Sequence, residues 1–235
     1  MNGHVLSVTE GRTHAAVDGF LKDMDASLLD GLKVVAMDMW PAYEHAVRKH
    51  TKADIAYDRF HVMSHISHAV DLVRRKEHRE LLASGDERLK GTKYLWLTRS
   101  DRLEGQRLDR FQQLQRSSLR TARAWWRREI ADHLWGFSDY ASAALAWKRW
   151  ARNTLRSHQE PMKKVAQMVL KHLDGIAVAA STGVTNAHAE SLNAKIQKVK
   201  RMAHGYRNME SFKNAIYFHC GGLSMYLEKP SSTTN

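Results

Sequence analysis

Two short apolar segments joined by one helical segment constrain the fold of this chain more than any other feature. Residues 33–39 are apolar on both faces until Asp38 interrupts them, which is typical of a buried strand. Pro41 suits the first turn of a helix over residues 42–50, and residues 53–60 form a second short strand. Because the connection is short and helical, the two strands are expected to pair in parallel in an α/β layer.

The segment before this unit continues the alternation of strand and helix. Residues 5–8 are a short apolar run closed by a Glu-Gly turn, which predicts another strand. Residues 13–24 place Ala16, Phe20 and Met24 four positions apart, as on one face of a helix.

The stretch from residue 61 to residue 176 shows helical spacing only. Pro161 and Gly175 are expected to bracket one of its helices, over residues 162–173. Several tryptophans here fall on apolar stripes, which favours a helical core; a platform that stacks on nucleobases is the alternative. The tryptophans of this stretch are Trp96, Trp125, Trp126, Trp135, Trp147 and Trp150.

A helix over residues 186–202 carries two distinct stripes. Its apolar face is formed by Ala189, Leu192, Ile196 and Val199. A polar stripe is formed by Asn186, Glu190, Asn193 and Gln197. A last helix is expected over residues 208–220, closed by two glycines, and residues 230–235 are typical of a loose tail.

The charge balance predicts a polyanionic partner. Lysine and arginine number 37, and aspartate and glutamate number 25, so the formal net charge is +12 at pH 7. Such a charge attracts nucleic acid, although solvated helix faces remain the alternative for any single basic patch. The densest patches are residues 74–76, 127–128, 148–149 and 195–201.

Several classes of protein are excluded. A lone cysteine, Cys220, excludes an internal disulfide framework and a zinc site built from several cysteines. No apolar run approaches the roughly 20 residues of a membrane span, and no signal peptide is visible. There is no phosphate-binding glycine loop and no nucleophile elbow. A cytoplasmic protein without a membrane partner is therefore expected.

Asp38 and Glu190 are the first candidates for chemistry. Asp38 lies at the carboxyl end of a strand, where α/β folds gather their sites. A carboxylate from the sheet and one from a helix would suit Mg²⁺, and two such ions could cleave a phosphodiester. The alternative is that Asp38 caps the next helix and Glu190 pairs with a lysine.

His61, His65 and His68 are the second candidates. Their spacing places them on one helix face, which could bind Zn²⁺, but no carboxylate stands between them as in a zinc protease. Two other roles are favoured over metal binding: a helix face that becomes positively charged near phosphate, or packing of the histidine rings.

The strings VVAMDMWPAY, YDRFHVMSHISHAVDLVRRKEHREL and TNAHAESLNAKIQKVKRMAHGYRN resemble the DDE-type insertion-sequence transposases of the ISL-three family. The resemblance runs over residues 5–223. It implies a ribonuclease-H-like domain whose three acidic residues bind two Mg²⁺ ions and cut and join double-stranded DNA at transposon ends and targets. Asp38 matches the second acid and Glu190 the third, with an all-helical insertion between them.

The resemblance also implies domains and DNA contacts. Residues 1–61 and 177–229 would form the catalytic domain, residues 62–176 the helical insertion and residues 230–235 a tail. The implied DNA-binding residues are Arg59, His61, Asn186, Asn193, Lys195, Lys198 and Arg201.

One departure from the family changes the expected activity. The family's first acid lies on a strand upstream of the segment that resembles residues 5–8. The resemblance therefore implies a truncated sheet and a transposase fragment that is inactive by itself. Such a fragment is expected to form a homo-oligomer or a mixed assembly with full-length transposase, and to associate with the nucleoid when it binds DNA. The alternatives are a catalytically silent DNA-binding protein that modulates full-length transposase, and a helical scaffold, which the net charge disfavours.

Overall fold

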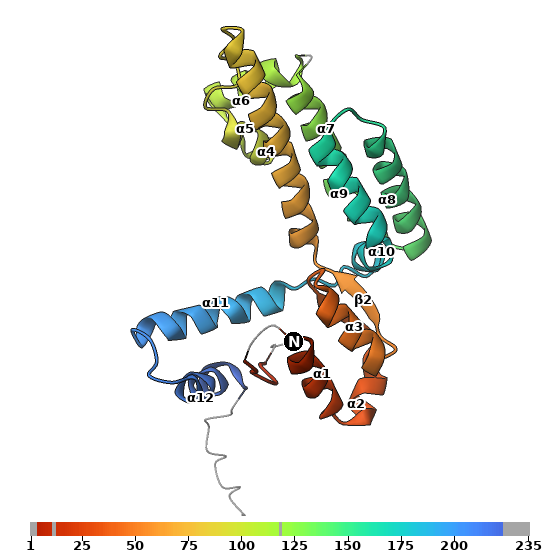
Figure 1. Cartoon of the computed structure of the whole chain (residues 1–235), viewed down its shortest axis with the longest axis vertical. Helices are drawn as coiled ribbons and strands as arrows, with labels where there is room; N and C mark the ends of the chain where they lie inside the picture. Colours follow the sequence, from red (N-terminus) through yellow and green to blue (C-terminus); the bar gives the residue numbers. More distant parts are fainter. Residues whose placement is uncertain (1–3, 11–12, 118, 223–235) are drawn as a thin grey trace, which may run out of the picture. The chain divides into compact units, whose positions relative to one another are not determined.

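The computed structural model describes residues 4–10, 13–117 and 119–222 (Figure 1). The chain divides into two compact units, Met24–Thr185 and Met1–Asp23 with Asn186–Asn235. Most described residues are helical, and they contain a single sheet of two strands. The α/β expectation is thus confirmed only for this small sheet, and the ribonuclease-H-like assignment and its domain bounds stay predictions.

The larger unit begins with the predicted strand–helix–strand arrangement. Its first elements are α2 (Ala26–Gly31), β1 (Val34–Met37), α3 (Pro41–His50) and β2 (Asp54–Tyr57). The two strands pair in parallel, from Val34 opposite Asp54 to Met37 opposite Tyr57. Pro41 occupies the first turn of α3, where its missing N–H costs no helical hydrogen bond. The parallel pairing expected from the short helical connection is confirmed.

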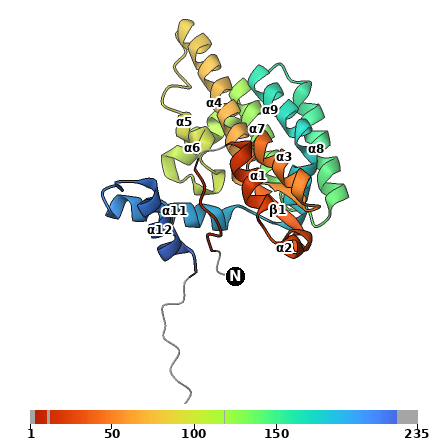
Figure 2. The same ribbon diagram turned by 60° about the horizontal axis from the view of Figure 1, so that its bottom comes forward.

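The rest of the larger unit is helical, as predicted. It comprises α4 (Arg59–Ala83), α5 (Lys93–Leu97), a 3₁₀ turn (Ser100–Arg102), α6 (Gly105–Gln115), α7 (Arg120–His133), α8 (Tyr140–Leu155), α9 (Glu160–Lys171) and α10 (Leu173–Thr182). Helix α4 packs on α7 and α9, and α8 packs on α9 and α10. Helices α8 and α9 lie side by side in both views (Figure 1 and Figure 2).

Aromatic side chains form much of the helical core. Trp96, Phe111 and Trp125 are buried and meet edge to face, with ring centroids 5.5 Å and 5.0 Å apart. Trp147 and Trp150 are also buried and make a similar contact at 5.7 Å. These tryptophans confirm the core interpretation, because edge-to-face packing adds to the burial of their large apolar area.

The prediction that Gly175 ends a helix is wrong. Gly175 lies inside α10, and a Cβ atom there would overlap a ring carbon of Tyr57 on β2. Glycine is needed for the close approach of α10 to β2, and it does not stop the helix. The helix predicted over residues 162–173 is present as α9, which ends at Lys171, and α10 ends at Gly183, whose φ of 67° is left-handed.

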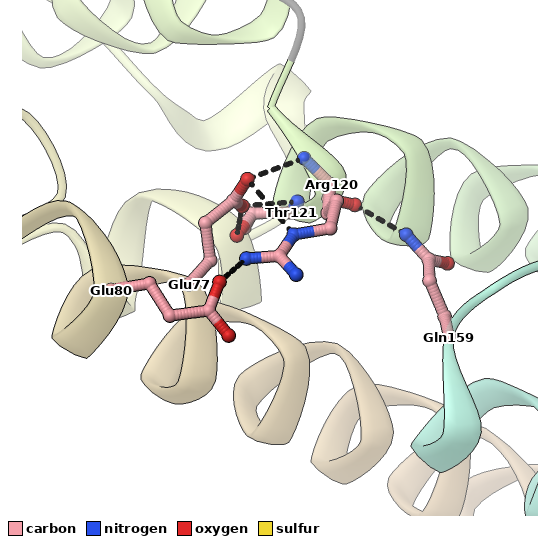
Figure 3. A network of polar contacts seen from close by, with 5 residues as sticks. All are labelled: Glu77, Glu80, Arg120, Thr121 and Gln159. Carbon is pink, nitrogen blue, oxygen red and sulfur yellow. Dashed lines mark hydrogen bonds and ion pairs between the residues drawn. The ribbon is translucent and has the colours of Figure 1, made fainter.

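A polar network around the buried carboxylate of Glu77 connects three helices (Figure 3). Glu77 of α4 accepts hydrogen bonds from the backbone N–H groups of Arg120, at 2.8 Å, and Thr121, at 2.7 Å. The side-chain amide of Gln159 donates to the carbonyl oxygen of Arg120 at 2.6 Å, and the Arg120 guanidinium pairs with Glu80. Glu77 thus caps the start of α7 from another helix, satisfying donors that the helix itself leaves unpaired.

The smaller unit contains α1 (His14–Lys22), α11 (Ala187–Met202) and α12 (Met209–Cys220). The strand predicted over residues 5–8 is absent, so that prediction is wrong. The Val5 N–H donates to the Cys220 carbonyl at 2.8 Å, and the Val8 N–H donates to the Tyr217 hydroxyl at 3.0 Å. The end of α12 therefore takes the hydrogen bonds that a neighbouring strand would have taken. The tail predicted over residues 230–235 lies outside the described residues.

A helix that crosses a bilayer needs about 20 consecutive residues of mainly apolar character. Within the described residues, no helix combines this length with the required hydropathy.

Candidate functional site

The carboxyl ends of the two strands bring Asp38 and Asp58 to one edge of the sheet. Met37 pairs with Tyr57 in the last register position, and the Asp58 N–H donates to the Met37 carbonyl at 3.2 Å. Asp38 and Asp58 follow directly after these residues. Parallel strands gather side chains at this edge, which is where α/β proteins bind ligands.

Asp58 has a structural role at this edge. Its side chain is buried and accepts a hydrogen bond from the His61 N–H at 3.1 Å, which caps the start of α4. A capping carboxylate satisfies an otherwise unpaired helical donor and stabilises the helix by about 1 kcal/mol.

Asp38 is the more open of the two carboxylates. Its side chain is 40% exposed, so it is not the buried group that the apolar strand suggested. It does not cap the next helix either, since Trp40 holds the N-cap position of α3 with no side-chain hydrogen bond. Asp38 Oδ1 lies 3.7 Å from His61 Nδ1. An open carboxylate beside a strand end is a suitable oxygen ligand for a hard cation.

A polar cluster beside this edge was not identified from the sequence. The Tyr57 hydroxyl donates to Glu44 Oε2 at 2.7 Å, and Arg48 Nε donates to Glu44 Oε1 at 3.0 Å. Burial and the Glu44 carboxylate raise the pKa of Tyr57 well above its usual range. The ring of His172 meets Tyr57 edge to face at 5.0 Å, and burial lowers the pKa of His172. The cluster joins α3, β2 and the start of α10.

The three histidines of α4 share a face, as their spacing predicts. The His61 and His65 rings lie 5.4 Å apart. Burial, followed by the charges of His61 and His68, lowers the pKa of His65. Across the described residues, no group of three or more His, Cys, Asp or Glu side chains could hold a metal ion, so the zinc alternative gains no support.

Glu190 lies in the first turn of α11 and is exposed. It makes no ion pair with any residue that the structure describes, so the pairing with a lysine considered above is not observed. Asn193 and Gln197 are exposed on the same stripe, and Asn186 holds the N-cap position. A carboxylate in a helix's first turn interacts favourably with the helix dipole while remaining open to ligands.

The basic residues predicted to bind DNA lie along α11. Lys195, Lys198 and Arg201 are all exposed. Lys195 and Lys198 line a groove of about 470 Å³, together with Tyr206 and His219. The cations on this helix can therefore reach phosphates without first breaking a buried contact.

Arg59 and His61, the other predicted DNA contacts, lie at the start of α4. The Arg59 guanidinium donates to Asp132 Oδ1 at 2.9 Å, with both side chains partly exposed. His61 lies beside Asp38, as described above. Both residues therefore have partners within the larger unit.

The predicted site residues fall into two groups. Asp38, Arg59 and His61 belong to the larger unit, where the carboxyl edge of the sheet brings Asp38 and His61 together. The smaller unit holds the others, which share α11: Asn186, Glu190, Asn193, Lys195, Lys198 and Arg201.

Comparisons with known proteins agree on one type of relative. The family model for ISL3-type DDE proteins, described as "Transposase", matches residues 1–216. The "Transposase for insertion sequence element IS1001" of Bordetella parapertussis is 28% identical over 212 residues. That alignment covers 88% of this chain and 52% of the relative, so the chain spans about half the length of that protein. No solved structure matches the chain.

Proposed function

Because the chain belongs to the ISL3 family of DDE transposases, we propose that Asp38 and Glu190 supply two of the acidic ligands for DNA strand cleavage and transfer with two Mg²⁺ ions. One observation carries the proposal: the Asp38 carboxylate is open at the carboxyl edge of paired parallel strands and is not used to cap a helix. When bound, the ions would activate a water or a 3′-hydroxyl and stabilise the leaving oxygen.

The role proposed for Glu190 is to add a second acidic ligand from a helix. Its carboxylate is exposed and free of ion pairs with described residues, so binding a cation would not require an existing pair to break. The separation from Asp38 in sequence, 190 − 38 = 152 residues, is taken up mostly by helices α4 to α10. This agrees with the helical insertion that the family resemblance implies.

The proposed DNA-binding side chains position phosphates for this chemistry. Lys195, Lys198 and Arg201 would neutralise backbone phosphates, and Asn186 and Asn193 would donate hydrogen bonds beside Glu190. In the larger unit, Arg59 and His61 would contact DNA near Asp38. The proposed partner is double-stranded DNA at transposon ends and target, bound by a homo-oligomer or by a mixed assembly with a longer transposase.

Binding of Mn²⁺, a paramagnetic substitute for Mg²⁺ with the same preference for oxygen ligands, tests the metal site. Electron paramagnetic resonance titration of the 235-residue chain is expected to show that Asp38→Asn and Glu190→Gln each weaken Mn²⁺ binding at least about 10-fold, since each removes a charged ligand.

Matched acids serve as controls for this titration. Asp30→Asn in the larger unit and Glu210→Gln in the smaller unit remove one exposed carboxylate each, and both are expected to leave Mn²⁺ binding unchanged. Equal Mn²⁺ affinity for wild type, Asp38→Asn and Glu190→Gln would reject the proposed metal site. The same samples test the expectation of inactivity, through metal-dependent nicking of supercoiled DNA.

A catalytically silent DNA-binding protein is the second candidate function. The row of exposed cations on α11 favours it, because these residues can bind phosphates whether or not metal is bound. Salt-dependent DNA binding without cleavage, and co-purification with a longer transposase, would support this candidate. Robust strand cleavage by the chain would exclude it.

A further inference from the structure

Helices α7 and α8 enclose a groove of about 470 Å³ within the larger unit. Arg123, Trp126 and Ile130 line it from α7, and Arg149 and Trp150 line it from α8. None of the residues assigned a role in the proposed function lines this groove.

Trp126 is the distinctive side chain of this groove. It is 51% exposed, whereas its neighbour Trp125 is buried in the core. The two rings meet edge to face at 5.0 Å, so the buried ring supports the exposed one. Trp150 Nε1 donates to the Arg127 carbonyl at 2.8 Å, which fixes the opposite wall to α7. The groove therefore presents an indole ring to solvent on a rigid support.

The rim of the groove is positively charged. Arg123, Arg127 and Arg149 line it, no carboxylate does, and none of the three forms an ion pair with an acid of the described chain. Burial lowers the pKa of Arg127, and repulsion from the nearby Arg123 charge lowers it further. Bound anions would relieve this repulsion.

We propose that this groove binds an unpaired nucleotide of single-stranded DNA, with the base against Trp126 and flanking phosphates at Arg123, Arg127 and Arg149. An aromatic ring beside clustered arginines suits this ligand, because every base has a flat face and every linkage carries an anion. The proposal rests on DNA as the partner in the proposed function, but it does not depend on Asp38 or Glu190. An acidic peptide would match the charge but not the flat indole face.

The test measures binding of fluorescent oligothymidylate, and of a blunt duplex, by anisotropy. Trp126→Ala is expected to weaken oligothymidylate binding about 10-fold, since stacking on one aromatic ring contributes on that order. Trp126→Phe is expected to retain most of the affinity, and duplex binding is expected to change little. Arg149→Gln is expected to reduce the salt dependence of binding by the equivalent of about one phosphate.

Leu145→Ala is the matched control, because Leu145 is 69% exposed on α8 and does not line the groove. Far-ultraviolet circular dichroism and Mn²⁺ binding should match wild type in Trp126→Ala, Trp126→Phe, Arg149→Gln and Leu145→Ala. Oligothymidylate affinity that is equal in wild type and Trp126→Ala would overturn the proposal, as would an acidic peptide that binds at Trp126 while oligothymidylate does not. If either of these results were obtained while Asp38→Asn still lost Mn²⁺ binding, only the groove proposal would be rejected and the proposed metal site would be retained.

Discussion

Glu77 shows how one buried carboxylate can organise a helical region. Its two oxygens accept hydrogen bonds from the first two N–H groups of α7, and the Thr121 hydroxyl also donates to it at 2.6 Å. Removing the carboxylate would leave these donors without partners in a buried place, which costs more than the net value of the hydrogen bonds themselves.

Glu77→Ala is expected to lower the free energy of unfolding by about 3 kcal/mol, since it uncaps α7 and unpairs buried donors. The midpoint of urea unfolding measures the change. Glu80→Ala is the control, because Glu80 binds the same arginine from an exposed position, and such pairs contribute little. Similar midpoints for both variants would contradict the capping role.

Gly175 permits a second prediction at this scale. Gly175→Ala is expected to destabilise the protein by about 1–3 kcal/mol, because the new methyl group would overlap the Tyr57 ring. Gly19→Ala in α1 is the matched control: its Cβ would meet nothing within 4 Å, and alanine favours a helix by up to about 1 kcal/mol. Thermal unfolding of the two variants should shift in opposite directions. A stabilised Gly175→Ala protein would show that α10 does not press on β2.

At the scale of elements, α11 differs from the helices of the larger unit. None of its described residues is buried, although α11 contacts α12. The helix carries one carboxylate in its first turn, followed by a row of exposed cations. Burial of apolar area therefore contributes little to its stability. Its composition is better explained by contact with a polyanion than by core packing.

Replacing Lys195, Lys198 and Arg201 together with alanine is expected to weaken DNA binding uniformly across sequences. It should also reduce the slope of log affinity against log salt by about 2 to 3, because each phosphate that is no longer neutralised lowers the slope by nearly one unit. Electrophoretic mobility shifts over a salt series measure both quantities.

A control triple variant removes the same charge from cations that are already paired. Arg88 binds Asp86 at 2.6 Å, Lys90 binds Glu87 at 3.0 Å and Lys163 binds Glu160 at 2.7 Å. Alanine at these three positions is expected to change the salt slope much less. Equal slopes for the two triple variants would mean that net charge alone, rather than α11, accounts for binding.

At the scale of the whole molecule, the proposed function requires Asp38 and Glu190, which are far apart in sequence, to bind the same ions. Shared ligands make their substitutions non-additive. Asp38→Asn, Glu190→Gln and the double variant are therefore expected to lose the same number of bound Mn²⁺ ions. A double variant whose loss equals the sum of the two single losses would indicate independent sites.

The sequence by itself determined the features that depend on neighbouring residues. The parallel β1–α3–β2 unit followed from apolar runs and a short connection, and α11 and α12 followed from helical spacing and capping residues. The start of α1 at Thr13 and of α12 at Asn208 are such local features, since each cap accepts a hydrogen bond from a residue three positions on. Asp38 was predictable as a site residue for the same reason, because its position at the carboxyl end of a strand is visible in the neighbouring sequence.

Only the tertiary structure decided the features that depend on distant partners. Residues 5–8 resemble a strand but meet the end of α12, more than 200 residues away in sequence, and Gly175 resembles a stop but lies against Tyr57. Glu77 gave no local sign of a cap supplied by another helix. Arg123 and Arg127 are neighbours of Trp126 in sequence, but only the packing of α8 on α7 brings Arg149 to the same groove. Local spacing determines which face of a helix is apolar, whereas the packing of the whole chain determines which residues cover that face.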